Sequence, residues 1–91
     1  MPSNKTWYVY LIECSDGSLY TGITVDLAAR FAAHRDGRGA RSMRMHAPVR
    51  MLAAEEHPDR STASKAEYRI KQLTAAQKRA YAATITPDPL T

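Results

Sequence analysis

Five side chains that can transfer protons or bind anions and metal ions fall at positions that the sequence pattern turns inward. Two are phenols on a predicted hairpin, two lie one turn apart on a predicted helix, and the last is a carboxylate on the apolar side of another helix. They are Tyr10, Tyr20, Arg30, His34 and Glu67. Such groups are rarely buried without a partner or a task, so their combination in one small domain indicates a functional site.

Each of these residues, taken singly, has an ordinary structural explanation. A tyrosine in a strand is usually a core residue whose hydroxyl reaches water. His34 alone is more often a surface or packing residue, and Glu67 can form an ion pair with Lys71 one turn later. The hypothesis of a functional site therefore rests on the five residues occurring together.

A hairpin must bring the two tyrosines together. Trp7–Glu13 and Leu19–Ile23 are rich in aromatic and β-branched residues, which predicts two strands. Residues 15–17, with the sequence Ser-Asp-Gly, lie between the two runs and predict the turn.

The turn type decides whether the tyrosines share a face of the sheet. A two-residue turn would pair Tyr10 with Ile23 and leave the two phenols on opposite faces. A three-residue loop with Gly17 in the left-handed conformation instead pairs Tyr10 with Gly22. We predict the three-residue loop, in which the phenols share a face and Gly22 leaves space beside Tyr10 for a ligand. The hydroxyls are then expected to converge with the arginine and the carboxylate on one cleft.

Three helices and a third strand complete the predicted fold. Asp26 is expected to cap a helix that reaches Arg35, with Leu27 and Phe31 on its buried side. Val49–Glu55 predicts a third, shorter strand. The expected fold class is therefore α+β, with a small three-stranded antiparallel sheet flanked by about three helices.

The last two helices are predicted from caps and apolar spacing. Ser61 is expected to cap a helix that reaches Leu73, and Thr74 with Gln77 fits a capping box that opens a final helix ending near Ala83. The inward residues are predicted to be Ala63, Ala66, Ile70 and Leu73 in the first of these helices, and Ala76, Ala80 and Tyr81 in the second. Pro87 and Pro89 are expected to end regular structure and leave 84–91 frayed.

Length and composition indicate one domain, 1–91, with its core at about 7–83, because 91 residues can build only one modest core. No stretch approaches the roughly 18 apolar residues of a membrane span, and the N-terminus has no secretory pattern. Cys14 is the single cysteine, which predicts a reduced, structural thiol. We therefore expect a cytoplasmic protein.

Positive charge is concentrated between residues 30 and 50, where six arginines face one aspartate. Arginine matches phosphate oxygens in bidentate geometry, so this segment indicates a nucleic acid partner, although a solvated basic loop would look the same. Residues 36–48 lack periodicity and are expected to form an exposed loop that is mobile unless an anion holds it. The expected phosphate contacts are Arg35, Arg38, Arg41 and Arg44.

Several of these motifs resemble the signature of the GIY-YIG nucleases. The triplets Tyr8-Val9-Tyr10 and Tyr20-Thr21-Gly22, followed by the arginine, histidine and glutamate named above, have the spacing of that family. The resemblance runs over residues 7–73 and is greatest to small, stand-alone bacterial members, through the segments 19–24, 37–40 and 66–73. This chain differs in its first triplet, which has Tyr8 in place of glycine, and it shows neither the polar asparagine that larger members add after the metal-binding helix nor their attached DNA-binding domain.

The resemblance implies hydrolysis of nucleic acid phosphodiesters, with DNA favoured. Glu67 would hold one Mg²⁺ or Mn²⁺, and Arg30 would bind a non-bridging phosphate oxygen. Either Tyr10 or Tyr20 would accept the proton of the attacking water, with Tyr10 favoured as the base and Tyr20 as a relay. His34 would hydrogen-bond within the pocket or shuttle a proton.

Three hypotheses follow from the residues and the resemblance. The first is a metal-dependent endonuclease that acts on branched, flapped or damaged DNA, the substrates of DNA repair, by structure rather than sequence. The second is a nucleic-acid-binding module with the nuclease fold and little activity without a protein partner that supplies DNA targeting. The third is a structural domain whose tyrosines and carboxylate merely pack.

Overall fold

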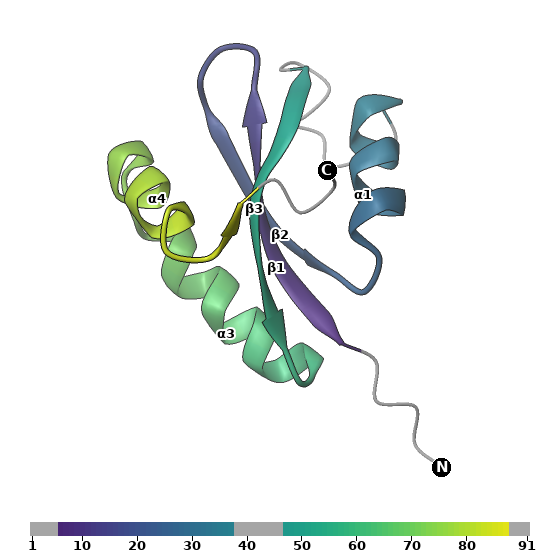
Figure 1. The fold of residues 1–91 in the computed structure, drawn as a ribbon, viewed down its shortest axis with the longest axis vertical. Coiled ribbons are helices and arrows are strands. Elements are labelled where there is room, and N and C mark those ends of the chain that lie inside the picture. The colour runs from purple at the N-terminus through teal and green to yellow at the C-terminus, as the bar shows by residue number, and fades with distance from the viewer. Residues whose placement is uncertain (1–5, 38–46, 88–91) are drawn as a thin grey trace.

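The computed structural model describes residues 6–37 and 47–87, which form one antiparallel sheet with helices on both faces (Figure 1). The strand order is β2-β1-β3-β4, so the two longest strands lie in the middle. The strands are β1 Trp7–Cys14, β2 Leu19–Thr24, β3 Pro48–His57 and the two-residue β4 Thr86–Pro87. The helices are α1 Leu27–Arg35, α3 Arg60–Lys71 and α4 Ala75–Ala82. The predicted α+β class with three main strands and three helices is confirmed.

The hairpin has the predicted three-residue loop. Tyr10 lies opposite Gly22, and Ile12 lies opposite Tyr20, so the two phenols share a face of the sheet. Gly17 has φ 86°, the left-handed conformation that glycine adopts without strain, and its N–H donates to the carbonyl of Cys14 at 2.9 Å. The register on which the candidate site depends is therefore confirmed.

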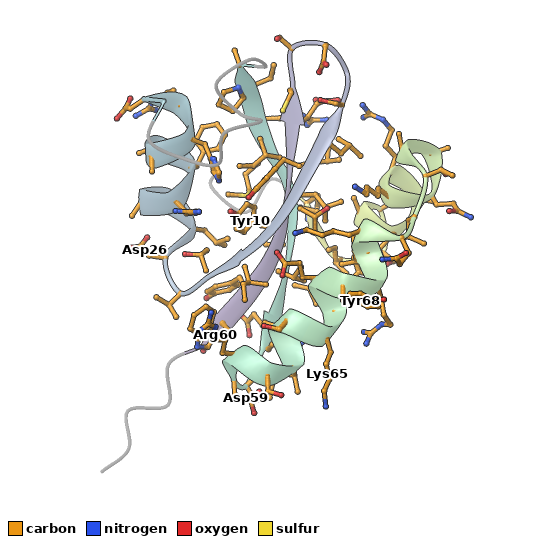
Figure 2. All side chains as sticks on the ribbon, turned by 180° about the vertical axis from the view of Figure 1, so that it is seen from behind. Tyr10, Asp26, Asp59, Arg60, Lys65 and Tyr68 are labelled. Carbon is orange, nitrogen blue, oxygen red and sulfur yellow. The ribbon has the colours of Figure 1, made fainter. Side chains whose placement is uncertain are left out.

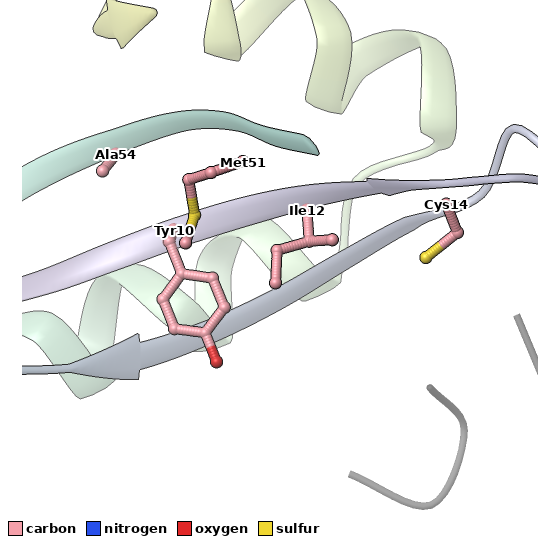
Figure 3. Close-up of a cluster of buried hydrophobic side chains, with 5 residues drawn as sticks. All are labelled: Tyr10, Ile12, Cys14, Met51 and Ala54. Atoms are coloured by element: carbon pink, nitrogen blue, oxygen red, sulfur yellow. The ribbon is translucent and has the colours of Figure 1, made fainter. Parts of the chain in front are cut away.

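Alternate residues of β1 face different helices. Tyr10 and Ile12 belong to a buried cluster that also packs against α1, and Figure 3 shows Tyr10, Ile12, Cys14, Met51 and Ala54 in this cluster. Val9 and Leu11 point to the other face and pack against α3. Figure 1 shows α1 on one side of the sheet and α3 and α4 on the other. The period of two along a strand thus divides the core into two layers.

Strand β3 is longer than the predicted Val49–Glu55, because tertiary packing outweighs the weak strand propensity of alanine. Ala53 lies opposite Leu11 whereas Met51 lies opposite Ile12, so Leu52 is the extra residue of a β-bulge. Ala53 and Ala54 are buried, where small side chains fit beneath their larger neighbours.

The helix caps are partly as predicted. Asp26 caps α1, its carboxylate accepting from the N–H of Ala29 at 3.0 Å. The prediction of Ser61 as the next cap is wrong, since Asp59 accepts from the N–H of Thr62 at 2.8 Å and α3 begins one residue later. Asp59 follows Pro58, which has no backbone N–H to donate. The chain is therefore extended up to Asp59, and the first turn of the helix starts there.

Helix α4 begins with the predicted capping box of Thr74 and Gln77, but its buried side differs from the prediction. Ala76 and Ala80 are exposed, whereas Tyr81 is half-buried as expected and Ala82 is buried. Alanine is too small to decide which side of a short helix packs, so the larger tyrosine sets the orientation.

Regular structure continues further than predicted at the C-terminal end. Thr86 and Pro87 form β4 and pair with Ala54 and Ala53 of β3. Pro87 was expected to end all structure, but a residue without an N–H is tolerated in an edge strand. The remainder of the expected frayed tail, 88–91, lies outside the described residues.

Two further expectations concern the basic loop and the cysteine. Residues 38–46 of the expected loop, which include Arg38, Arg41 and Arg44, lie outside the described residues, so the expected mobility of the loop stays a prediction. The thiol of Cys14 is buried, and burial raises its pKa, as expected of a structural cysteine. No helix in the described ranges is both long enough and apolar enough to cross a membrane.

Candidate active site

The Tyr10 phenol is the centre of the polar cluster on the α1 face. Tyr10 is 1% exposed and comes from the middle of β1; Figure 2 shows it on the side of the sheet that faces α1. Its hydroxyl lies 3.1 Å from Nε2 of His34 and accepts from Nε of Arg30 at 3.4 Å. The structure thus joins three of the predicted site residues directly.

Helix α1 positions the other two members of this contact. The helix starts at its Asp26 cap, and Leu27 and Phe31 pack against the buried cluster of the sheet. Arg30 and His34 are one turn apart and therefore project from the same side of the helix toward the strands. His34 is 1% exposed, so its ring is part of the core as well as of the polar cluster.

The position of the Tyr10 ring requires a residue without a side chain at Gly22. A Cβ atom at this position would lie 2.5 Å from the Tyr10 hydroxyl and 2.7 Å from the ring carbon that bears it. The prediction that Gly22 leaves space for a ligand is therefore wrong, because the ring of Tyr10 already lies across the glycine. The glycine allows the phenol to reach toward α1 along the sheet surface.

Burial and Arg30 together set the protonation states. Burial raises the pKa of Tyr10 more than the hydrogen bond from Arg30 lowers it. Burial first and the arginine charge second lower the pKa of His34, so its ring is neutral at neutral pH. The Tyr10 hydroxyl and Nε2 of His34 share a hydrogen bond of 3.1 Å. The other ring nitrogen, Nδ1, is buried and has no hydrogen-bond partner among the described residues.

Tyr20 completes the cluster from the neighbouring strand. Its ring centroid is 6.2 Å from that of Tyr10 and 4.9 Å from that of His34, the latter in an edge-on contact. The hydrogen bond to Tyr10 raises the pKa of Arg30, and Tyr20 raises it further by a smaller amount. Tyr20 is half-buried and is therefore the more accessible of the two.

The family model described as GIY-YIG catalytic domain matches residues 6–80. The chain belongs to the GIY-YIG family.

Relatives of this GIY-YIG chain match it over most of their length. A UPF0213 protein of Cupriavidus pinatubonensis is 46% identical over 85 residues, which cover 93% of this chain and 94% of the relative. A UPF0213 protein of Xanthomonas axonopodis pv. citri is 49% identical over 81 residues, or 89% of this chain and 79% of the relative. These names specify no activity, substrate or metal.

Solved structures support the same fold. The solution NMR structure of a protein from E. faecalis is 37% identical, with a TM-score of 0.62, and the match covers 92% of this chain and 90% of that one. The solution NMR structure of a UPF0213 protein from Bacillus halodurans is also 37% identical, with a TM-score of 0.55 and coverage of 87% and 84%. GIY-YIG domains form a nuclease superfamily, which implies nucleic acid binding.

Glu67 lies on α3, the helix that covers the opposite face of the sheet from α1. Its negative charge is the smallest of the influences that raise the pKa of Tyr10, after burial and the charge of Tyr20. At the same time its Oε2 atom is 3.3 Å from Nζ of Lys71, the ion pair that was the ordinary structural alternative. The side chain keeps 24% of its surface exposed, which leaves the carboxylate open to a ligand.

The donor set of this GIY-YIG domain fits a weakly held hard cation. No cluster of three or more His, Cys, Asp or Glu side chains that could hold a metal occurs among residues 6–37 and 47–87. A single accessible carboxylate such as Glu67 suits Mg²⁺, which is commonly bound by one or two carboxylates together with waters and substrate phosphate. A zinc site would need several nitrogen or sulfur ligands, which this surface does not offer.

The structure also describes one of the predicted phosphate contacts, Arg35, and a cavity outside the tyrosine cluster. Arg35 is exposed and its Nε lies 3.7 Å from Oδ1 of Asp36, and its role as a phosphate contact stays a prediction. The expected cleft is not the cavity seen beside α4, which has a volume of about 210 Å³. That cavity is lined by Arg50, Leu52, Arg79, Ala82, Ala83 and Pro87.

The exposed cations of α3 form a second basic group, which the sequence prediction did not include. They could have been found by counting, since the helix has four basic residues and one acidic residue, Glu67. The basic residues are Arg60, Lys65, Arg69 and Lys71.

Proposed function

We propose that this domain is a metal-dependent endonuclease that hydrolyses nucleic acid phosphodiesters, with DNA the favoured substrate. The observation that carries the proposal is the hydrogen bond from Arg30 to Tyr10, a phenol that also bonds a buried, neutral histidine. An arginine held by uncharged partners keeps its charge for an anion, which is what a cleaved phosphodiester presents. The substrate is recognised by structure rather than by sequence, since contacts to phosphate read no bases.

Tyr20 is the better candidate for the general base. The sequence favoured Tyr10, but a side chain that is 1% exposed cannot meet an attacking water, and its raised pKa keeps it protonated. Tyr20 is half-buried and lies on the same face of the sheet, with its ring centroid 6.2 Å from that of Tyr10. Tyr20 therefore accepts the proton of the attacking water, while Tyr10 and His34 hold Arg30 and the ring in place.

Glu67 would hold the single Mg²⁺ or Mn²⁺. When bound, the ion supplies charge neutralisation at the phosphate and at the departing oxygen. Glu67 must first leave its ion pair with Lys71, and this costs little because exposed pairs of this spacing contribute about 0.3–0.5 kcal/mol. Arg30 binds a non-bridging oxygen, where negative charge grows during attack.

A second function, a binding module that needs a protein partner for cleavage, is favoured by one observation. The Glu67 carboxylate is paired with Lys71 rather than directed at the tyrosine cluster. In that case Arg35 and the basic segment that follows it would supply affinity, and a partner in the same cytoplasmic complex would bring the DNA. The two functions differ in whether the pure protein cleaves.

Incubation of the pure protein with single-stranded, duplex, nicked and branched DNA and RNA, in Mg²⁺, Mn²⁺ or chelator, tests the proposal. We expect cleavage that requires the metal and falls to background in Glu67→Gln and Tyr20→Phe, while Tyr10→Phe retains part of it. Glu67→Gln should change the free energy of unfolding by under about 0.5 kcal/mol, because it removes an exposed pair. Full cleavage by Glu67→Gln contradicts the mechanism, and binding without cleavage by the wild type supports the second function.

A further inference from the structure

Tyr68 is an aromatic side chain that the fold leaves uncovered. It is 69% exposed, the most exposed large hydrophobic side chain among the residues described. It lies on α3, whose buried side is formed by Ala63, Ala66 and Ile70, so it points away from the sheet. Packing therefore gives this ring no structural role.

Basic residues surround this ring. Lys65, one turn earlier, lies on the same side of α3 as Tyr68, and Arg69 follows the tyrosine directly. Figure 2 shows Arg60, Lys65 and Tyr68 along the helix. The helix carries four exposed cations against one carboxylate, so its outer surface is positive overall. A ring among exposed cations is complementary to a nucleic acid strand, whose bases stack and whose phosphates are anionic.

We propose that Tyr68 stacks on an unpaired base, which makes single-stranded nucleic acid, or an unpaired end or flap, the preferred ligand of this surface. A base inside a duplex already stacks on its neighbours and presents no free face to a side chain, whereas a single strand does. Lys65 and Arg69 bind the phosphates on either side of that base. An unpaired strand is the partner that we favour over a protein, because one strand supplies both the base for the ring and the phosphates for the cations, and GIY-YIG domains form a nuclease superfamily.

The position of Tyr68 links this surface to the proposed chemistry. Tyr68 follows Glu67 directly, so their Cα atoms are about 3.8 Å apart and their side chains diverge around the helix. A strand whose phosphate lies at Glu67 can place the adjacent base on Tyr68. This part rests on the proposed function, whereas stacking itself requires neither metal nor cleavage.

Binding in chelator tests the stacking directly. Fluorescence anisotropy compares labelled oligo(dT), the same oligonucleotide with abasic sites, and a blunt duplex, for the wild type, Tyr68→Leu and Tyr68→Phe. Leucine keeps an apolar side chain without the aromatic face, and phenylalanine keeps the face without the hydroxyl. We expect Tyr68→Leu to bind oligo(dT) roughly 5- to 150-fold more weakly, as loss of one stacked base requires, and Tyr68→Phe to bind like the wild type.

Comparison with the abasic strand and the duplex makes the outcome specific. The wild type should prefer oligo(dT) to its abasic form, and Tyr68→Leu should lose that preference while its duplex affinity stays unchanged. The proposal is overturned if Tyr68→Leu keeps the preference, if duplex and single-strand affinities fall equally, or if the wild type does not bind oligo(dT). A protein that shows the stacking but cleaves nothing refutes the nuclease function and leaves the stacking intact.

Discussion

The two faces of the sheet use the same central strand for different purposes. On the α3 face, Val9 and Leu11 of β1 pack against Ala66 and Ile70, an apolar layer that excludes water. On the α1 face, the alternate residue Tyr10 contacts an arginine and a histidine, and a buried imidazole nitrogen has no partner among the described residues. The apolar layer therefore stabilises the fold, whereas the polar layer holds polar groups away from the water that would otherwise solvate them.

This contrast shows how one small domain can carry a polar site on one face of its sheet and an apolar layer on the other. The apolar layer fixes the backbone of β1, and alternation along the strand transmits that rigidity to Tyr10. The polar layer depends on this support, because a buried polar atom without a partner destabilises the fold. Changes to the two layers should therefore separate stability from chemistry.

The largest expected effect comes from the apolar layer. Leu11 is fully buried between β2, β3 and α3, so Leu11→Ala should lower the free energy of unfolding by about 2–5 kcal/mol. For a domain of this size the melting temperature should fall by roughly 8 °C or more. Below the melting transition, any cleavage per folded molecule should stay near that of the wild type. A selective loss of cleavage would show that the two layers are not separable.

Substitution of the glycine beneath the phenol should affect both properties. In Gly22→Ala the new methyl group would meet the Tyr10 hydroxyl at 2.5 Å, so the ring must move or the strand must shift. Overpacking of this kind lowers stability by about 1–3 kcal/mol, and here it should also separate Tyr10 from Arg30 and reduce cleavage. Thermal unfolding and cleavage assays on the same preparation measure both effects.

A double variant serves as the control for the glycine substitution. Adding Tyr10→Phe to Gly22→Ala removes the closest atom, although the ring carbon at 2.7 Å remains, so part of the lost stability should return. If the two substitutions are strictly additive in stability, the phenol is not the group that the methyl meets, and the proposed contact is wrong.

Features that depend on local chemistry were predictable from the sequence. The hairpin register follows from a loop in which only glycine takes the left-handed conformation, and the Asp26 cap and the capping box at Thr74 follow from side chains that bond their own helix. The placement of Tyr10 and Tyr20 on one face follows from that register. The contact between α1 and the sheet follows from Leu27 and Phe31.

Features that depend on distant packing were not predictable. The buried side of α4 and the pairing of β4 with β3 are decided by neighbours far along the chain, and the alanines involved carry little signal of their own. The reason for Gly22 was also hidden, because the direction of the Tyr10 ring is set by His34 and Arg30 on another element. The catalytic roles of these residues and of Glu67 stay predictions.

The smallest expected effect is the pH dependence of the polar layer. His34 is buried beside Arg30, and both its burial and that positive charge lower its pKa below the value of about 6.5 that it has when unfolded. The unfolded chain therefore binds the proton more readily than the folded protein. As pH falls below about 6.5, the free energy of unfolding should decrease, by at most about 1.4 kcal/mol per pH unit for one proton. Above that pH the histidine is neutral in both states and its contribution is constant.

Comparison with His34→Gln isolates this effect, because glutamine can still accept the Tyr10 hydrogen bond but does not titrate. Other titrating groups, including His57 and the carboxylates, are common to both proteins and cancel in the difference between their unfolding free energies. Denaturant unfolding between about pH 5 and 8 should show the wild type losing stability relative to the variant as the pH falls. Parallel curves would mean that His34 takes up a proton without destabilising the folded protein. The α1 face would then tolerate a second positive charge beside Arg30. The polar layer would then resemble a solvated surface, and its difference from the apolar layer would lie in composition alone.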